Sequence, residues 1–163
     1  MAKTKEHVNQ LLQGKQTFTL SNNLTTLDLS YSKIGFSEAK LISQSLLSNT
    51  TLTHLNLGGN KIADLGMKWI SLILLTNSSL TDLDLSMNSI HVEGAQLISR
   101  CLQINTTLSH LNLANNEIGN EGAEFISKSL QINSTLTHIN LENNQISDNG
   151  AQLISLSLQK NSV

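Results

Sequence analysis

Residues 80–90 read LTDLDLSMNSI, and this pattern of leucine, asparagine and isoleucine recurs along the chain at a fixed spacing of 28 residues. The first leucines of the five copies are Leu24, Leu52, Leu80, Leu108 and Leu136. Five units therefore follow one another without a slip, over residues 24–51, 52–79, 80–107, 108–135 and 136–163. A constant period of this length indicates a repeat architecture, in which each unit buries its apolar face against its neighbours.

Each unit contains two different hydrophobic periods. In its first half, leucines alternate with polar residues, which indicates a half-buried strand; in its second half, apolar residues recur three and four positions apart, which indicates a helix. Strands separated by helical crossovers pair in parallel. Strands lie about 4.8 Å apart, whereas packed helices need about 8 to 10 Å, so the array must curve. The sequence therefore predicts an α/β fold, a right-handed β-α superhelix with the parallel sheet on its concave side and the helices on its convex side.

Two asparagines and one glycine recur in the units. The asparagine at the strand exit, for example Asn88, is expected to bind backbone groups of adjacent turns in a buried ladder. The glycine near the helix start, for example Gly122, is expected to let the helix approach the sheet closely. The asparagine after the helix, for example Asn133, lies in an N-x-S/T glycosylation sequence. We interpret it instead as a left-handed helix stop followed by a turn.

The two ends of the array are predicted to differ. Residues 1–23 are expected to form an N-terminal cap with a short helix over residues 6–13 and a strand over residues 17–20. The link from this strand to the first repeat is too short for a parallel connection, so we expect an antiparallel hairpin. No polar capping sequence follows the fifth unit. Its strand and helix are therefore expected to present an open flank, which is a template for another chain.

Composition narrows the class of protein further. The chain has 163 residues, a formal net charge of −2 and 13% charged residues. It lacks the basic face that nucleic acids and anionic membranes require, so we expect neither as a partner. A single cysteine, Cys101, and an N-terminus without a signal sequence favour a cytoplasmic location. No phosphate-binding, zinc-protease or serine-hydrolase motif occurs, so we expect no cofactor and no enzymatic activity.

With its 28-residue unit, its LxxLxLxxNxI run and its GAxxI helix, the chain resembles the ribonuclease-inhibitor-like leucine-rich repeat family over residues 24–163. The resemblance implies a horseshoe fragment that binds a protein partner, usually through its concave face. It does not imply binding to a ribonuclease, because the inhibitor itself is rich in cysteine and much longer. The asparagine- and serine-rich, proline-free sequence also resembles repeat proteins that intracellular bacteria secrete as effectors, which act in the cytoplasm of a host cell.

The positions between the strand leucines, and the turn after them, are expected to face the concave surface and to bind the partner. The candidates with aromatic, thioether, imidazole or carboxylate side chains are Tyr31, His54, Asp82, Asp84, Met87, His110, His138 and Glu142. Neighbouring histidine and aspartate side chains in this set could also share a zinc ion. Side chains on a gently curved surface point in parallel, however, so we expect them to be solvated rather than to converge on a metal.

The helix side offers a second candidate contact. We expect Leu72 and Leu75 to form a convex patch, because the third and fourth units have polar residues at these positions. Cys101 is interpreted as a packing residue rather than a nucleophile. The leading hypothesis is a non-enzymatic protein–protein interaction module. The alternatives are a structural module that forms a homodimer through its C-terminal edge and, as the weakest, a metal-dependent enzyme built on the histidine and aspartate row.

Overall fold

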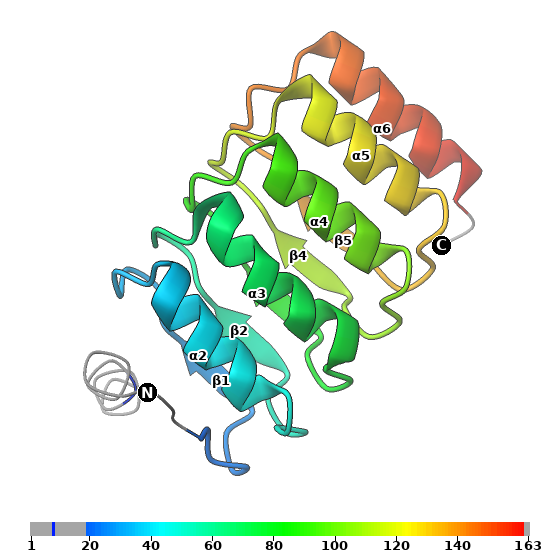
Figure 1. Cartoon of the computed structure of the whole chain (residues 1–163). Helices are drawn as coiled ribbons and strands as arrows, with labels where there is room; N and C mark the ends of the chain where they lie inside the picture. Colours follow the sequence, from blue (N-terminus) through cyan, green and yellow to red (C-terminus); the bar gives the residue numbers. More distant parts are fainter. Residues whose placement is uncertain (1–7, 9–18, 162–163) are drawn as a thin grey trace.

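A computed structural model of the chain describes Val8 and residues 19–161. Strands and helices alternate along it (Figure 1). The strands are β1 (Thr26–Asp28), β2 (His54–Asn56), β3 (Asp82–Asp84), β4 (His110–Asn112) and β5 (His138–Asn140). The helices are α2 (Phe36–Leu46), α3 (Ala63–Thr76), α4 (Val92–Leu102), α5 (Gly119–Leu130) and α6 (Asp148–Lys160).

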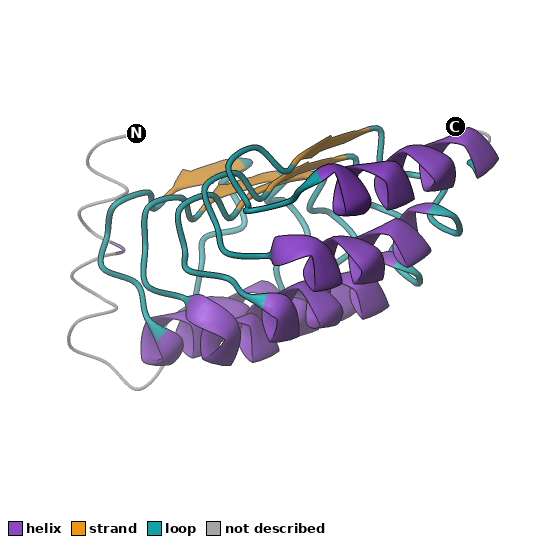
Figure 2. Ribbon diagram, turned by 90° about the horizontal axis from the view of Figure 1, so that it is seen from above, coloured by secondary structure: helices purple, strands orange, loops and turns teal. Residues whose placement is uncertain are grey.

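The strands form one parallel sheet in the order β1-β2-β3-β4-β5, and each pairs with residues 28 positions away. The sheet is one layer and the helices are the other, with the helices side by side along the array (Figures 1 and 2). The predicted α/β solenoid of parallel strands and helices is therefore confirmed. None of the helices in the described ranges is long and apolar enough to cross a membrane.

The hydrophobic core fills the space between the two layers. It is built from the fixed leucine and isoleucine positions of the repeat; in the second unit Leu55, Leu57 and Ile70 are at most 1% exposed. Burial of one such side chain contributes about 1.5–3 kcal/mol to the free energy of unfolding. The core is continuous from unit to unit, so the units support one another and the spacing between them is held constant.

The strand-exit asparagines form the predicted buried ladder. Asn116 Nδ2 donates to the carbonyl oxygens of Leu113 in its own unit (2.9 Å) and Leu85 in the preceding unit (3.0 Å). Its Oδ1 accepts from the backbone N–H groups of Asn88 (2.9 Å) and Ile90 (3.0 Å). One side chain thus satisfies backbone groups of two adjacent units, at the point where the chain leaves the sheet in each of them.

The asparagines after the helices form a second ladder, on the opposite side of each unit. Asn133 Oδ1 accepts from Leu136 N, and its Nδ2 donates to the carbonyl oxygens of Leu102 and Asn105 in the preceding unit. The turn interpretation of the glycosylation sequences is confirmed here, because the side-chain amide is buried and engaged. The expected left-handed conformation is wrong: Asn77, the counterpart in the second unit, has φ −82° and ψ 128°, which is extended backbone.

Close packing near the helix starts explains the recurring glycine. A Cβ atom at Gly122 would lie 2.5 Å from Cγ2 of Ile118 and 3.0 Å from Cβ of Ala95 in α4. The glycine therefore leaves room for the Ile118 side chain, just before α5, and for the close approach of the neighbouring helix α4. This differs from the expectation, in which the close approach was to the sheet.

Helix α4 is capped by the unit before it. Asp64 Oδ1 accepts from the backbone N–H groups of His91 and Gly94, both at 2.9 Å. A carboxylate at a helix N-terminus satisfies unpaired donors and interacts favourably with the helix dipole. The contact therefore ties the orientation of α4 to the preceding unit.

The predicted N-terminal cap lies mostly outside the described residues. Within it, Val8 and Leu20 are each 4% exposed and belong to the core cluster. Thr19 and Leu20 lie outside any strand, so the antiparallel hairpin stays a prediction.

The flank of β5 and α6 that faces away from β4 and α5 is open in the described part of the chain. Ile139 of β5 is only half-buried, whereas its counterpart Leu111 in β4 is fully buried. A hollow on this flank is lined mainly by apolar side chains: Ile139, Leu141, Ile146, Ala151, Ile154 and Leu158.

Replacing Asn116 with alanine is expected to lower the free energy of unfolding by about 3 kcal/mol, because several buried backbone groups lose their partner at once. Urea denaturation followed by circular dichroism measures the loss. Asn140→Ala is the matched control, since the exposed Asn140 side chain accepts one bond, from Glu142 N (3.0 Å), and its loss should cost less than about 1 kcal/mol. Equal losses for the two variants would contradict the ladder.

Candidate functional site

Side chains from the five strands form two rows on the face of the sheet that points away from the helices, called the sheet face below. The first row is Thr26, His54, Asp82, His110 and His138. The second row is Asp28, Asn56, Asp84, Asn112 and Asn140. Every lysine and arginine of the described ranges lies on a loop or helix instead: Lys33, Lys40, Lys61, Lys68, Arg100, Lys128 and Lys160. The sheet face therefore carries acidic and neutral side chains.

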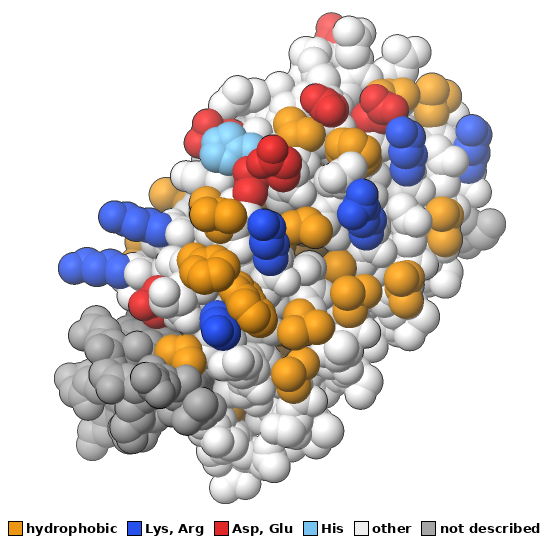
Figure 3. All heavy atoms as spheres, in the orientation of Figure 1, with side chains coloured by type: hydrophobic (Ala, Val, Ile, Leu, Met, Phe, Trp, Pro, Cys, Tyr) orange, Lys and Arg blue, Asp and Glu red, His pale blue; other side chains and the backbone are white. Residues whose placement is uncertain are grey.

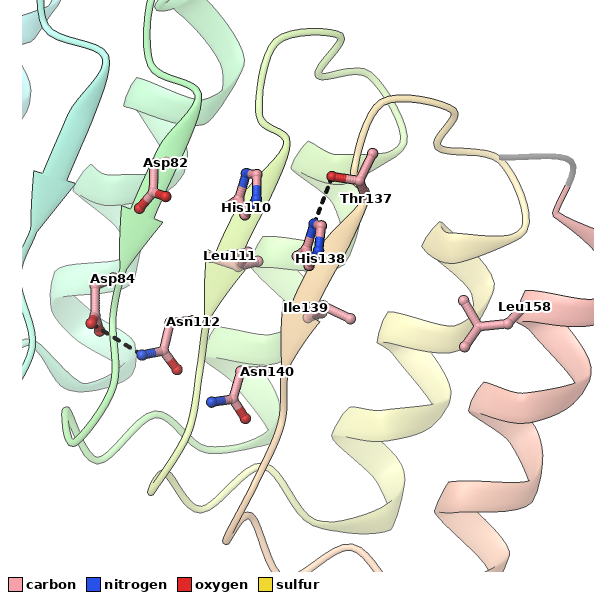
Figure 4. Close-up of a pocket in the computed structure, with 10 residues that line it drawn as sticks. All are labelled: Asp82, Asp84, His110, Leu111, Asn112, Thr137, His138, Ile139, Asn140 and Leu158. Atoms are coloured by element: carbon pink, nitrogen blue, oxygen red, sulfur yellow. Dashed lines mark hydrogen bonds between the residues drawn. The ribbon is translucent and has the colours of Figure 1, made fainter.

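Histidines dominate the first row. His54, His110 and His138 are all exposed. The rings of His110 and His138 stack face to face with centroids 4.4 Å apart and an interplanar angle of 7° (Figure 4). Parallel rings do not converge on a common point. Within the described residues, no group of three or more histidine, cysteine, aspartate or glutamate side chains could hold a metal ion.

Side chains of the second row also form hydrogen bonds that hold the turns after the strands. Asp84 Oδ1 accepts from Ser86 N (2.8 Å) and Ser86 Oγ (2.6 Å), and its Oδ2 accepts from Asn112 Nδ2 (3.0 Å). Its counterparts accept from the backbone N–H two residues later in the same way; for Asn140 the donor is Glu142 N. Asp84 was selected from the sequence as a partner-binding residue, but the structure shows that both of its oxygens already have partners.

In addition to the two rows, one residue of each unit lies just after the strand, where the chain turns away from the sheet. This set of residues is called the rim below. It consists of Tyr31, Gly59, Met87, Asn115 and Asn143, which all have a positive φ between 53° and 67°. The first four rim residues each donate from the backbone N–H to a carbonyl oxygen of the next unit; Tyr31 N, for example, donates to Gly58 O at 2.9 Å. The left-handed backbone conformation therefore occurs at the rim and at a few other loop and helix-start positions, such as Lys33 and Gly119, but not at the helix stop.

Tyr31 and Met87 meet on the rim although 56 residues separate them. The Tyr31 hydroxyl lies 3.4 Å from Met87 Sδ. The tyrosine ring reaches that far by lying across Gly59, where a Cβ atom would be only 2.4 Å from a ring carbon. Tyr31 is nevertheless 70% exposed and Met87 46% exposed. Both were predicted as binding residues, but their contact depends on the small residue between them.

Glu142 and His138 complete the predicted set at the β5 end of the sheet face, and both are exposed. A shallow hollow in the sheet face extends from Asp82 across His110 and His138 to Leu158 of α6 (Figure 4). The predicted residues therefore lie in two groups: Tyr31 and Met87 on the rim near β1 to β3, and the histidines with Asp82 across the sheet.

The helix side carries the predicted convex patch in modified form. Leu75 is 47% exposed, whereas Leu72 is half-buried. Further exposed apolar residues on the helices were not predicted, among them Phe36 and Leu65. Hydrophobic side chains on this face are interspersed with lysine and arginine (Figure 3).

The cysteine is buried, as its interpretation as a packing residue requires. Cys101 is 2% exposed, and its Sγ lies 3.4 Å from Ser71 O. Burial raises the pKa of the Cys101 thiol from 9.0 to about 11. At neutral pH the group is therefore a thiol, which is a weak nucleophile.

Comparison with known proteins supports the fold. A family model described as "Leucine Rich repeat" matches residues 20–35, 48–71, 76–99, 105–127 and 133–155. A leiomodin-1 structure described as "Actin-Binding Site 2 (ABS2)" superimposes with a TM-score of 0.76 and 23% identity, over 97% of this chain and 87% of that one. The tropomodulin C-terminal domain of Caenorhabditis elegans superimposes with a TM-score of 0.70 and 14% identity, over 96% and 92%. No curated protein matches the chain.

Gly59→Ala is expected to displace the Tyr31 ring, because the new methyl group would occupy its place. Loss of the NMR contact between the Tyr31 ring and the Met87 methyl group reports the displacement. Gly119→Ala is the matched control: it has the same positive φ but nothing within 4 Å of the added Cβ. Backbone strain should lower the free energy of unfolding of both variants by about 1 kcal/mol. Only Gly59→Ala should also move the Tyr31 ring. A Tyr31–Met87 contact that survives in Gly59→Ala would contradict this geometry.

Native Cys101 is expected to react with Ellman's reagent at pH 8 at least about tenfold more slowly than the unfolded chain. With a pKa of about 11, only about one thiol in a thousand is ionised at that pH, and the sulfur is also buried. Absorbance of the released thiolate, with and without guanidinium chloride, measures both rates. Equal rates would show that Cys101 is accessible in the folded protein.

Proposed function

The chain belongs to the leucine-rich repeat family, and from this premise we propose that it is a non-enzymatic protein-binding module that contacts its partner through the sheet face and the rim. The observation that carries the proposal is the exposed Tyr31, held in one position by its backbone conformation, by Gly59 beneath it and by Met87 beyond it. Tyrosine is enriched among the residues that dominate binding energy at interfaces. A side chain that is already ordered loses little entropy on binding.

The size of the sheet explains why the rim must take part. At about 4.8 Å per strand the five strands span about 20 Å, and three residues per strand extend about 10 Å. This area is well below the roughly 800 Å² per partner of a standard interface. A stable complex therefore needs the rim in addition to the two rows of the sheet face.

The arrangement of the ionisable side chains supports binding rather than catalysis. The histidine rings lie parallel on an open surface, both oxygens of Asp84 are held by hydrogen bonds, and the Cys101 thiol is buried. Among the described residues, the hydroxyl–imidazole pairs of the strands, such as Ser109 and His110, have no carboxylate bonded to the imidazole, so they do not form a hydrogen-bonded nucleophile, base and orienting group. The metal-dependent alternative has no support from this geometry.

Actin is the first partner to test, because the leiomodin-1 structure is described as an actin-binding site. We propose a cytoplasmic site of action, in the cell that makes the protein or, for a bacterial effector, in a host cell. The buried thiol of Cys101 and the buried amide of Asn133, which a glycan could not reach, are consistent with a chain that is neither oxidised nor glycosylated. The subtype we assign is ribonuclease-inhibitor-like, on the length of the unit and its helix.

A second candidate function is self-association through the open flank of β5 and α6. The apolar hollow around Ile139, Leu141 and Ile154 favours it, because an unpaired strand edge beside apolar side chains can receive a second copy. In this role the chain would be a structural module that forms homodimers.

Tyr31→Ala is expected to weaken partner binding by at least about 30-fold, which corresponds to a hot spot of about 2 kcal/mol. Biolayer interferometry with immobilised chain, tested first against monomeric actin and then against proteins recovered by cross-linking, measures the loss. Phe36→Ala is the control, because Phe36 is exposed on the helix side, and it should leave affinity unchanged. If Phe36→Ala or Leu75→Arg abolishes binding while Tyr31→Ala does not, the contact surface is the helix side. If the protein recovered by cross-linking is a second copy of this chain, and if Ile139→Lys abolishes that binding, self-association would be favoured.

A further inference from the structure

Each of the three histidines on the sheet face has a hydroxyl residue directly before it. The pairs are Thr53–His54, Ser109–His110 and Thr137–His138, with 2.7, 2.9 and 2.9 Å between the hydroxyl oxygen and imidazole Nδ1. A bond of this kind has two possible directions. Either the hydroxyl donates to Nδ1, or Nδ1–H donates to the hydroxyl oxygen, and the direction decides which ring nitrogen carries the proton.

A second bond made by the same hydroxyls selects the direction. Thr53 Oγ1 donates to Thr25 O (3.0 Å), Ser109 Oγ donates to Thr81 O (3.0 Å) and Thr137 Oγ1 donates to Ser109 O (3.1 Å). A hydroxyl has only one proton to donate. Since a carbonyl oxygen cannot donate in return, a hydroxyl that makes both bonds gives its proton to the carbonyl, and the imidazole then donates from Nδ1.

The third unit provides an internal control for this assignment. There Thr81 Oγ1 donates to Thr53 O (3.2 Å), although the next residue is Asp82 and no imidazole is present. The bond from hydroxyl to carbonyl is therefore a property of the repeat and does not depend on the histidine. Nδ1 of each histidine therefore lies beside a hydroxyl oxygen whose proton is used in the hydrogen bond to the carbonyl.

The consequence is a row of hydrogen-bond acceptors. With the proton on Nδ1, the exposed Nε2 of each ring carries a lone pair. The strand register places His54, Asp82, His110 and His138 on four adjacent strands, about 4.8 Å apart. Figure 4 shows Asp82, His110 and His138 along the same side of the sheet. The row presents an imidazole lone pair, a carboxylate and two further lone pairs.

Building on the proposed function of the sheet face, we propose that this row receives a donor-rich partner segment: an extended peptide with arginine or lysine side chains. The other ionisable side chains of the two rows are acidic, namely Asp28 and Asp84, and Glu142 follows β5; they favour a cationic segment over an anionic one. Lys33 and Lys61 lie further along the loops that lead to α2 and α3. The acceptors of the row and these carboxylates together match the N–H donors and the positive charge of such a segment.

The tautomer assignment is tested without any partner. Long-range ¹H–¹⁵N correlation spectra of the imidazole rings at pH 7.5 are expected to show Nδ1–H for His54, His110 and His138. In Thr53→Val, Ser109→Ala and Thr137→Val the hydroxyl is absent, so the ring beside each substitution should change its tautomer population while the other two stay as they were. An Nε2–H form in the unmodified chain would overturn the inference.

The choice of partner is tested with three probes of equal length, the acetylated peptides (Gly-Arg)₄, (Gly-Gln)₄ and (Gly-Glu)₄, titrated into the ¹⁵N-labelled chain. The arginine peptide is expected to shift resonances of the histidine row at pH 7.5 and to bind at least about fivefold more tightly than the glutamate peptide. The double variant His110→Phe/His138→Phe keeps two aromatic rings without acceptors. It should bind the arginine peptide more weakly than the unmodified chain does.

The outcomes separate the inference from the proposed function. Equal binding of the arginine and glutamate peptides, or equal binding of the arginine peptide by the unmodified chain and the double variant, would overturn the acceptor row. A natural partner whose binding is lost in Tyr31→Ala but unchanged in the double variant would also overturn it, while the proposed function would stand. Shifts confined to the helix side would instead contradict the sheet face as the contact surface.

Discussion

The structure depends on the asparagine side chain at the strand exit, which bonds backbone groups of two adjacent units at once. In a β-α solenoid the chain leaves the sheet at the same place in every unit, and the peptide groups exposed by that turn are buried under the next one. A buried peptide group without a partner is costly. Asn88 and Asn116 supply both donors and acceptors from one short side chain, which explains why the frame of 28 residues does not vary.

Most residues of each unit have structural roles in the repeat, so few are available to bind a partner. The recurring leucine, isoleucine, glycine and asparagine positions form the core, the close helix contacts and the ladders. The second row of the sheet face is also partly structural, because residues such as Asp84 and Asn140 form the turn that follows each strand. The first row and the rim remain, and these positions differ most in chemistry from unit to unit: imidazole, carboxylate, tyrosine, methionine and amide.

Features that follow from the repeated spacing could be predicted from the sequence, including the strands, the helices, their parallel order and the ladder through Asn116. Contacts between side chains that vary from unit to unit could not. The Tyr31–Met87 contact spans two units and requires Gly59 between them. The capping of α4 by Asp64 likewise joins a residue of the second unit to a helix of the third. The left-handed positions were misplaced because asparagine suits both that conformation and an extended turn, and only the bonds of Asn77 distinguish the two.

Exchange of the asparagine side-chain amide protons, measured by NMR on the folded chain, tests this account most directly. If the ladder holds the frame, the Nδ2 protons of Asn88 and Asn116, which are bonded to carbonyl oxygens of two units, exchange at least about a hundredfold more slowly than those of the exposed Asn140. Similar exchange rates for the three side chains would show that the ladder opens freely. The surface that it supports could then not be pre-formed for binding.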